Sequence, residues 1–161
     1  MQKAIFIDRD GTLNHNQDHY YVWRIEDFQL NPGVPETLAA LKERGFLLVV
    51  ITNQGGISRG EYSIVEVEAL HLHMESLMEQ EGVVLDEIYI CPHHPDQEAC
   101  LCRKPLPLMI EKALSRFDID PRQSYFIGDS ARDMQAGEAA GLTPILIEPN
   151  SDLTQVLDQI R

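Results

Sequence analysis

The sequence predicts an α/β fold in three layers, with helices on both faces of a mostly parallel sheet. Short continuous apolar runs, typical of strands buried on both faces, alternate along the chain with segments of helical periodicity. The length of 161 residues matches one ordinary domain, and no repeat, low-complexity tract or linker divides the chain. We therefore expect a single domain over residues 1–161.

Five strands and four helices are expected in alternation. The strands are apolar runs rich in β-branched or aromatic residues, at 4–7, 46–51, 87–90, 124–127 and 144–147. The helices are segments in which apolar residues recur every three or four positions, at 35–44, 67–78, 106–117 and 132–140. Repeated strand–helix units imply parallel strands with right-handed connections. Ligands of such sheets bind beyond the carboxyl ends of the strands, so candidate functional residues are sought there.

Charge and composition exclude several classes of protein. The chain carries 26 acidic and 13 basic residues, a formal charge of −13, which repels nucleic acids and anionic membrane surfaces. No apolar stretch approaches the roughly 20 residues of a membrane span. A charged residue at position 8 interrupts any signal-peptide core. We expect a cytoplasmic monomer without nucleic-acid or membrane partners.

Acidic side chains follow two of the predicted strands. Asp8 and Asp10 come directly after the first strand, Gly11 lets the chain turn away, and Asp129 follows a later strand. Taken alone, the first pair also fits an acidic turn. Three carboxylates at one edge of a sheet suit Mg²⁺, which prefers hard oxygen ligands and a substrate phosphate.

Four segments together resemble the motifs of the haloacid dehalogenase-like phosphatases. They are the Asp-Arg-Asp-Gly-Thr segment at 8–12 and, in the same order along the chain, residues 50–53, 103–105 and 127–133. The resemblance extends from residue 4 to about residue 147. It implies a Rossmann-like fold, here without a separate cap domain, because the stretch between Thr12 and Pro35 is too short for one.

The resemblance also implies a mechanism. Asp8 would attack phosphorus and form an aspartyl-phosphate, while Asp10 would act as general acid and then as general base. Thr52 and Lys104 would hold the transferring oxygens. Mg²⁺ would be bound by Asp8, by the backbone carbonyl of Asp10 and by Asp129.

Asp133 and Arg9 lie close in sequence to these predicted catalytic and metal-binding residues. Asp133 could support the metal's waters or could be a solvated acid at a helix N-terminus. Arg9 is given no catalytic role.

All three cysteines lie in one loop, residues 91–102. Cys91, His93, Cys100 and Cys102 supply the four ligands of a closed structural zinc site. His94 could replace His93, and free buried thiols are the alternative. A zinc ion here would direct the next residues, Arg103 and Lys104, at the substrate.

Within the resembled superfamily, two phosphatase groups carry such a zinc loop. One acts on D-glycero-D-manno-heptose 1,7-bisphosphate and the other on histidinol phosphate. Segments 53–60 and 18–22 are more similar to the heptose group, although Tyr20 stands where glycine is usual and the zinc loop is short, as in the histidinol group. Removal of the heptose 7-phosphate is therefore expected. Histidinol phosphate is the alternative substrate, and an inactive zinc-stabilised binding module is the alternative of a different class.

The candidate substrate-binding residues come from these segments and from the need to bind a second phosphate. Arginine pairs strongly with phosphate. The candidates are Asp18, Tyr21, Asn53, Arg59 and Arg103.

Overall fold

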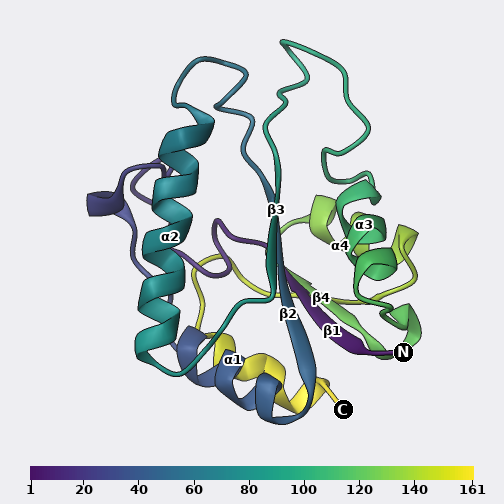
Figure 1. The fold of residues 1–161 in the computed structure, drawn as a ribbon. Helices are drawn as coiled ribbons and strands as arrows, with labels where there is room; N and C mark the ends of the chain where they lie inside the picture. The colour runs from purple at the N-terminus through teal and green to yellow at the C-terminus, as the bar shows by residue number, and fades with distance from the viewer.

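A parallel sheet of five strands forms the centre of the molecule (Figure 1). The computed structural model describes all of residues 1–161. The strands lie in the order β3-β2-β1-β4-β5. Their bounds are β1 (Lys3–Ile7), β2 (Phe46–Asn53), β3 (Glu87–Cys91), β4 (Tyr125–Gly128) and β5 (Thr143–Leu146). The predicted fold class is confirmed, and every strand lies within two residues of the predicted range.

Helices cover both faces of this sheet (Figure 1). On one face lie α1 (Val34–Glu43), α2 (Ile64–Gln80) and the C-terminal 3-10 helix η3 (Leu153–Gln159), and on the other lie α3 (Leu108–Arg116) and α4 (Ala131–Ala139). Two further short 3-10 helices are η1 (Ile25–Asp27) and η2 (Pro121–Gln123). Between β1 and α1 the chain forms only the helix η1 and isolated β-bridges.

Alternate residues of the central strands pack into the two layers. Ile5 and Ile7 of β1 belong to the core on the α1 and α2 side, whereas Ala4 and Phe6 belong to the core on the α3 and α4 side. This is the period of two expected for strand side chains. Because both faces are covered, β1 reads in the sequence as an unbroken apolar run.

The helix α2 begins three residues before the predicted start at Val67. Ser63 forms a capping box, in which its hydroxyl accepts the N–H of Glu66 and the carboxylate of Glu66 accepts the N–H of Ser63. The first turn carries exposed Ile64 and Val65, so the apolar periodicity appears only after the helix has begun.

The loops after β2 and β3 extend beyond the carboxyl end of the sheet, at the top of Figure 1. They contact one another, because Ser58 donates its N–H to the carbonyl of Pro92 at 3.1 Å and its hydroxyl accepts the N–H of His94 at 2.7 Å. This contact brings the cysteine–histidine loop to the edge where the aspartates lie.

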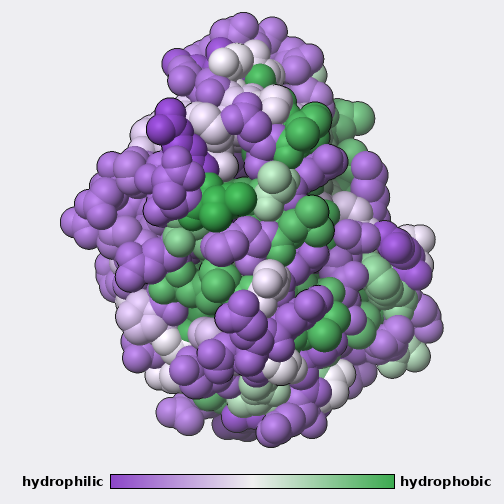
Figure 2. Space-filling view, turned by 60° about the vertical axis from the view of Figure 1, so that its left-hand side comes forward, coloured by the Kyte–Doolittle hydropathy of each residue, from purple (hydrophilic) through white to green (hydrophobic).

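The surface seen in Figure 2 is mostly hydrophilic, with hydrophobic residues in separate patches. None of the helices combines the length and the apolar character needed to cross a membrane.

Candidate active site

A pocket of about 280 Å³ lies beyond the carboxyl ends of the strands, where the sequence places the aspartates. Asp8 and Asp10 reach it from the end of β1, Asp129 from the end of β4, and Lys104 from the segment that follows the cysteine–histidine loop. The predicted edge of the sheet therefore does bring these four side chains together.

Lys104 connects two of the aspartates. Its ammonium group lies 2.7 Å from Asp8 Oδ1, 2.7 Å from Asp133 Oδ1 and 2.8 Å from the carbonyl oxygen of Ile51. The side chain is only 3% exposed. Burial alone would lower the pKa of Lys104, but the two carboxylates reverse this effect and raise it. Lys104 is therefore a fixed positive charge at the base of the pocket.

Asp133 is buried, with 1% of its surface exposed, so the interpretation as a solvated acid is wrong. Its second carboxylate oxygen accepts hydrogen bonds from the N–H and the hydroxyl of Ser130, which caps α4. The N-cap geometry of a nine-residue helix thus orients the acid that holds Lys104.

The carboxylates of Asp8 and Asp129 form an acidic pair without a full set of counter-charges. Oxygens of Asp8, Asp129 and Asp133 lie within 4.8 Å of one another. Burial raises the pKa of Asp8 well above its usual range, and the charges of Asp133 and Asp129 raise it further against the opposing effect of Lys104. Burial likewise raises the pKa of Asp129. Such a pair favours a bound cation or proton, and since both oxygens of Asp133 are engaged, Asp8 and Asp129 fit Mg²⁺ by their donor chemistry.

Gly11 makes the close approach of Asp129 possible. Its φ of +84° is one that side chains rarely adopt, and an added Cβ would lie 2.2 Å from Asp129 Oδ2. Only a glycine leaves this space for the carboxylate.

Asp10 is held by three side chains. Its Oδ1 accepts from the guanidinium of Arg9, at 3.1 and 2.7 Å, and from Asn14 Nδ2 at 3.0 Å, while its Oδ2 accepts from Gln54 Nε2 at 3.1 Å. Arg9 is fully buried and also contacts His71 Nε2 on α2 at 3.1 Å. Arg9 therefore fixes the orientation of Asp10, a structural role that the sequence did not suggest.

Thr52 of β2 is 1% exposed and is not among the residues that line the pocket. Its hydroxyl accepts a hydrogen bond from Gln54 Nε2 at 2.8 Å, so one amide group contacts both Thr52 and Asp10. The other end of Gln54 accepts from the hydroxyl of Tyr62 at 2.6 Å. Gln54 follows β2 directly, and its place at the end of a strand was the signal that could have identified it.

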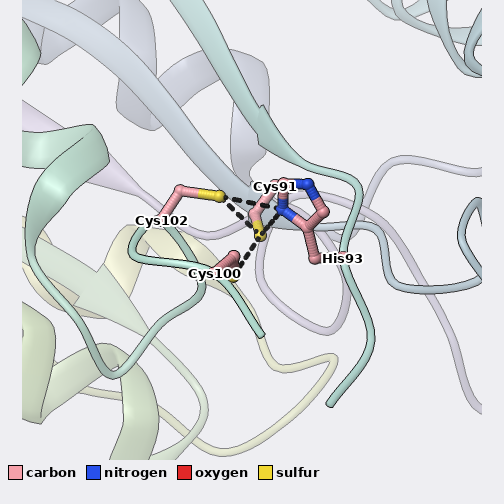
Figure 3. Close-up of side chains that lie close together, drawn as sticks. All are labelled: Cys91, His93, Cys100 and Cys102. Atoms are coloured by element: carbon pink, nitrogen blue, oxygen red, sulfur yellow. Dashed lines mark hydrogen bonds between the residues drawn. The ribbon is translucent and has the colours of Figure 1, made fainter. Parts of the chain in front are cut away.

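The cysteine–histidine loop forms a compact cluster in which the four predicted side chains point toward one another (Figure 3). Cys91 Sγ lies 3.0 Å from Cys102 Sγ, 3.8 Å from Cys100 Sγ and 3.6 Å from His93 Nδ1. Ligand atoms of a tetrahedral zinc site are separated by about 3.5–3.8 Å, given Zn–S near 2.3 Å and Zn–N near 2.0–2.1 Å. The distances from Cys91 to His93 and Cys100 match this range, whereas Cys102 lies closer than that, at 3.0 Å from Cys91 Sγ and 3.2 Å from His93 Nδ1. The set of three thiols and one imidazole, with Nδ1 of the histidine facing the sulfurs, suits a metal ion by its donor chemistry.

The thiols of this cluster differ in acidity. Burial raises the pKa of Cys91. For Cys100 burial would also raise the pKa, but N–H groups of Arg103 and Cys102 lower it to about 7. Backbone N–H groups directed at a sulfur stabilise the thiolate, which is the form that binds metal.

His94 is not part of the cluster. Its Nδ1 accepts the N–H of Asp96 at 3.1 Å, and its side chain lines the pocket with Tyr21, Asn53 and Arg103. His93 is therefore the histidine of the cluster, and His94 lies outside it.

The predicted substrate-binding residues separate into two groups. Tyr21, Asn53 and Arg103 line the pocket, although both polar ends of the Asn53 amide are already paired with the backbone of Lys104. Asp18 and Arg59 are exposed and lie outside the pocket, and Asp18 pairs instead with His15 at 3.5 Å. Both belong to loops, where neighbours in sequence point in different directions.

Besides Gln54, five lining residues were not predicted from the sequence as functional. Two come from the loop after β1, one from the loop after β2 and two from the start of α4, namely Asn16, Tyr20, Gly55, Ser130 and Arg132. Ser130 and Arg132 stand within the fourth motif segment, whose position could have indicated them.

Comparison with known proteins gives consistent matches. The family model described as haloacid dehalogenase-like hydrolase matches residues 14–141. D-glycero-beta-D-manno-heptose-1,7-bisphosphate 7-phosphatase of Haemophilus ducreyi is 46% identical over 160 residues, which cover 95% of this chain and 87% of that protein. The protein of the same name from Escherichia coli K12 is 42% identical over 158 residues, covering 94% and 82%.

A solved structure matches as closely in shape. D,D-heptose 1,7-bisphosphate phosphatase from B. bronchiseptica, crystallised with magnesium and phosphate, superposes with a TM-score of 0.86 at 36% identity. The match covers 98% of this chain and 87% of that one.

Proposed function

Since this chain belongs to the haloacid dehalogenase-like hydrolase family, we propose that it is a phosphatase that removes the 7-phosphate of D-glycero-D-manno-heptose 1,7-bisphosphate. Relatives with this activity in their names are 42–46% identical over almost the whole chain. The observation that carries the proposal is the meeting of Asp8, Asp10, Asp129 and Lys104 in one pocket. Histidinol phosphate is not favoured, because these relatives carry the heptose name.

Asp8 is the proposed nucleophile. Lys104 donates a hydrogen bond to Oδ1 of Asp8, so Oδ2 remains to attack phosphorus and form an aspartyl-phosphate. Asp10 then donates a proton to the leaving sugar oxygen and later removes one from the attacking water. The bonds from Arg9, Asn14 and Gln54 keep the carboxyl group of Asp10 in place during both steps.

The chain as a whole is acidic, with a formal charge of −13. Binding of the phosphate oxygens therefore needs a positively charged group and hydrogen-bond donors within the pocket itself. Lys104 supplies a charge that is already oriented. The Thr52 hydroxyl, which accepts a hydrogen bond from Gln54, would add a donor. Asp8, Asp129 and the backbone carbonyl of Asp10 would hold Mg²⁺. When bound, Mg²⁺ would neutralise the charge of the phosphate beside these carboxylates.

The 1-phosphate of the substrate needs a second basic partner. Arg103 lines the pocket, and its Nη1 donates to the carbonyl of His93 at 2.9 Å. His93 is also a ligand of the proposed zinc site, which comprises Cys91, His93, Cys100 and Cys102. Structural Zn²⁺ at this site would therefore fix Arg103 toward the sugar phosphate.

Phosphate release from the heptose bisphosphate and from histidinol phosphate, each with and without Mg²⁺, tests this proposal. We expect Mg²⁺-dependent release that is much faster from the bisphosphate. Asp8→Asn should abolish release, whereas Asp158→Asn, the same change at an exposed position in η3, should leave it unchanged. Faster release from histidinol phosphate, or full activity of Asp8→Asn, would contradict it.

A further inference from the structure

Tyr20 stands at the edge of the pocket with most of its ring in solvent. Its side chain lines the pocket, yet the residue is 85% exposed, more than any other large hydrophobic residue of the chain. An aromatic ring left in water loses the free energy that its burial would supply. Such a ring beside a binding pocket is suited to a ligand that covers it.

The ring is held in position by other aromatic side chains. Tyr20 packs edge-on against Tyr21, with centroids 4.7 Å apart at 78°, and Tyr21 packs against Tyr62 at 5.5 Å. Tyr62 is 5% exposed and stacks on Trp23 at 6.0 Å. The row of rings thus extends from the core to the mouth of the pocket, so the outermost ring is directed by rings that are themselves packed.

The lining of the pocket is divided by chemistry. Of its fifteen residues only two are hydrophobic, and Tyr20 and Tyr21 are the aromatic ones, whereas Asp8, Asp129 and Lys104 gather at the ends of the strands. The hydroxyl of Tyr21 is buried, so it is not a polar contact that a ligand in the pocket reaches. A ligand with an apolar face, several hydroxyls and a phosphate matches this division.

From this arrangement we propose that Tyr20 is a specificity-determining residue whose ring covers the C–H face of the substrate's sugar ring. The inference rests on the proposed function, because it assumes a sugar phosphate in the pocket. The C–H bonds of a sugar carry small positive charge and meet the negative face of an aromatic ring favourably. None of the hydrogen bonds of Asp8, Asp10 and Lys104 involves Tyr20, so the role we assign to it is in binding alone.

The test compares Tyr20→Ala and Tyr20→Phe with the wild-type protein on two substrates, the heptose bisphosphate and acetyl phosphate, which has no sugar. Tyr20→Ala should raise KM for the bisphosphate by about 3- to 10-fold, the range of an aromatic contact, and leave kcat unchanged. Kinetics with acetyl phosphate should not change, and Tyr20→Phe should behave as wild type. Leu72→Ala, at an exposed position of α2 outside the pocket, is the matched control.

Three results would overturn the inference: an unchanged KM in Tyr20→Ala, an equal loss on both substrates, or a Tyr20→Phe defect as large as that of Tyr20→Ala. Thermal unfolding midpoints equal to wild type would show that each variant is folded. A wild-type protein inactive on the bisphosphate but active on another sugar phosphate would refute the proposed function, and Tyr20 would then be tested with that sugar. Activity on acetyl phosphate alone would refute both.

Discussion

Replacing Lys104 by methionine removes the positive charge that two buried carboxylates share. Asp8 and Asp133 each lie 2.7 Å from its ammonium group, and their side chains are 11% and 2% exposed. Loss of one partner from a buried ion pair typically costs about 3–5 kcal/mol, because the remaining charge stays out of water. We expect the free energy of unfolding of Lys104→Met to fall by this amount.

The measurement is urea unfolding at pH 7 without added Mg²⁺. Lys42→Met is a matched control, since Lys42 makes an ion pair of 2.8 Å with Asp86, but these side chains are 31% and 22% exposed. Partly exposed pairs contribute about 0–1 kcal/mol, so the control should lose little.

A second variant tests the cause. Adding Asp133→Asn to Lys104→Met removes one of the stranded carboxylates and should restore part of the lost stability, with a coupling of about 0.5–3 kcal/mol. A loss below about 1 kcal/mol in Lys104→Met, or two purely additive substitutions, would refute the idea of a shared buried charge.

Three further results are expected. A zinc ion at the proposed site would hold Cys91 and His93 together. Cys100→Ser should therefore contain no zinc by elemental analysis and should have a lower thermal midpoint and lower activity, whereas Asp96→Asn in the same loop should keep the zinc, the midpoint and the activity. A fully active zinc-free Cys100→Ser would contradict the structural role. Burial lowers the pKa of His71 from 6.5 to about 3, and the nearby Arg9 charge lowers it too, so stability is present above pH 6.5 and is lost as the pH falls towards 3. Relative to His71→Asn, the wild type should therefore lose about 2 kcal/mol between pH 7.5 and pH 5 in urea unfolding, and a pH-independent difference would show that His71 titrates normally. Gly11→Ala should be destabilised by about 1–2 kcal/mol through its positive φ and should also lose at least 10-fold in kcat/KM through its contact with Asp129. Gly82 has a similar φ of +77°, and an added Cβ would have no atom within 4 Å. Gly82→Ala should therefore be destabilised by a similar amount without losing activity. Equal values of kcat/KM for Gly11→Ala and Gly82→Ala would contradict the close approach of Asp129 to Gly11.

The strands and the carboxylates at their ends could be predicted because their causes are local in the sequence. A strand covered on both faces, such as β1, is built mainly from apolar residues. The polar residues of the site therefore follow directly after the strand, at the edge of the sheet. The cysteine–histidine cluster was predictable in large part, since its three cysteines and two candidate histidines all lie within twelve residues.

Other features depended on contacts between distant parts of the chain. Asp133 is buried in an ion pair with Lys104, 29 positions away. Arg9 pairs with the adjacent Asp10 but also contacts His71, which lies 62 positions away on α2. The sequence favoured Arg103 over Arg59 because Arg103 adjoins Lys104, but only the fold shows that Arg103 lines the pocket and that Arg59 is exposed on a loop outside it. The choice of His93 over His94 likewise required the course of the backbone after β3.

The central claim is that Asp8 forms a bond to phosphorus. Rapid quenching of the enzyme with heptose bisphosphate that carries radiolabelled phosphate at position 7, followed by peptide mapping, measures this directly. We predict acid-stable, base-labile label on the peptide that contains Asp8, formed and lost within single turnovers. In Asp10→Asn the label should form more slowly and also be lost more slowly, because Asp10 acts in both steps. Release of labelled phosphate at full rate with no label on the protein, or with label on another residue, would contradict the mechanism.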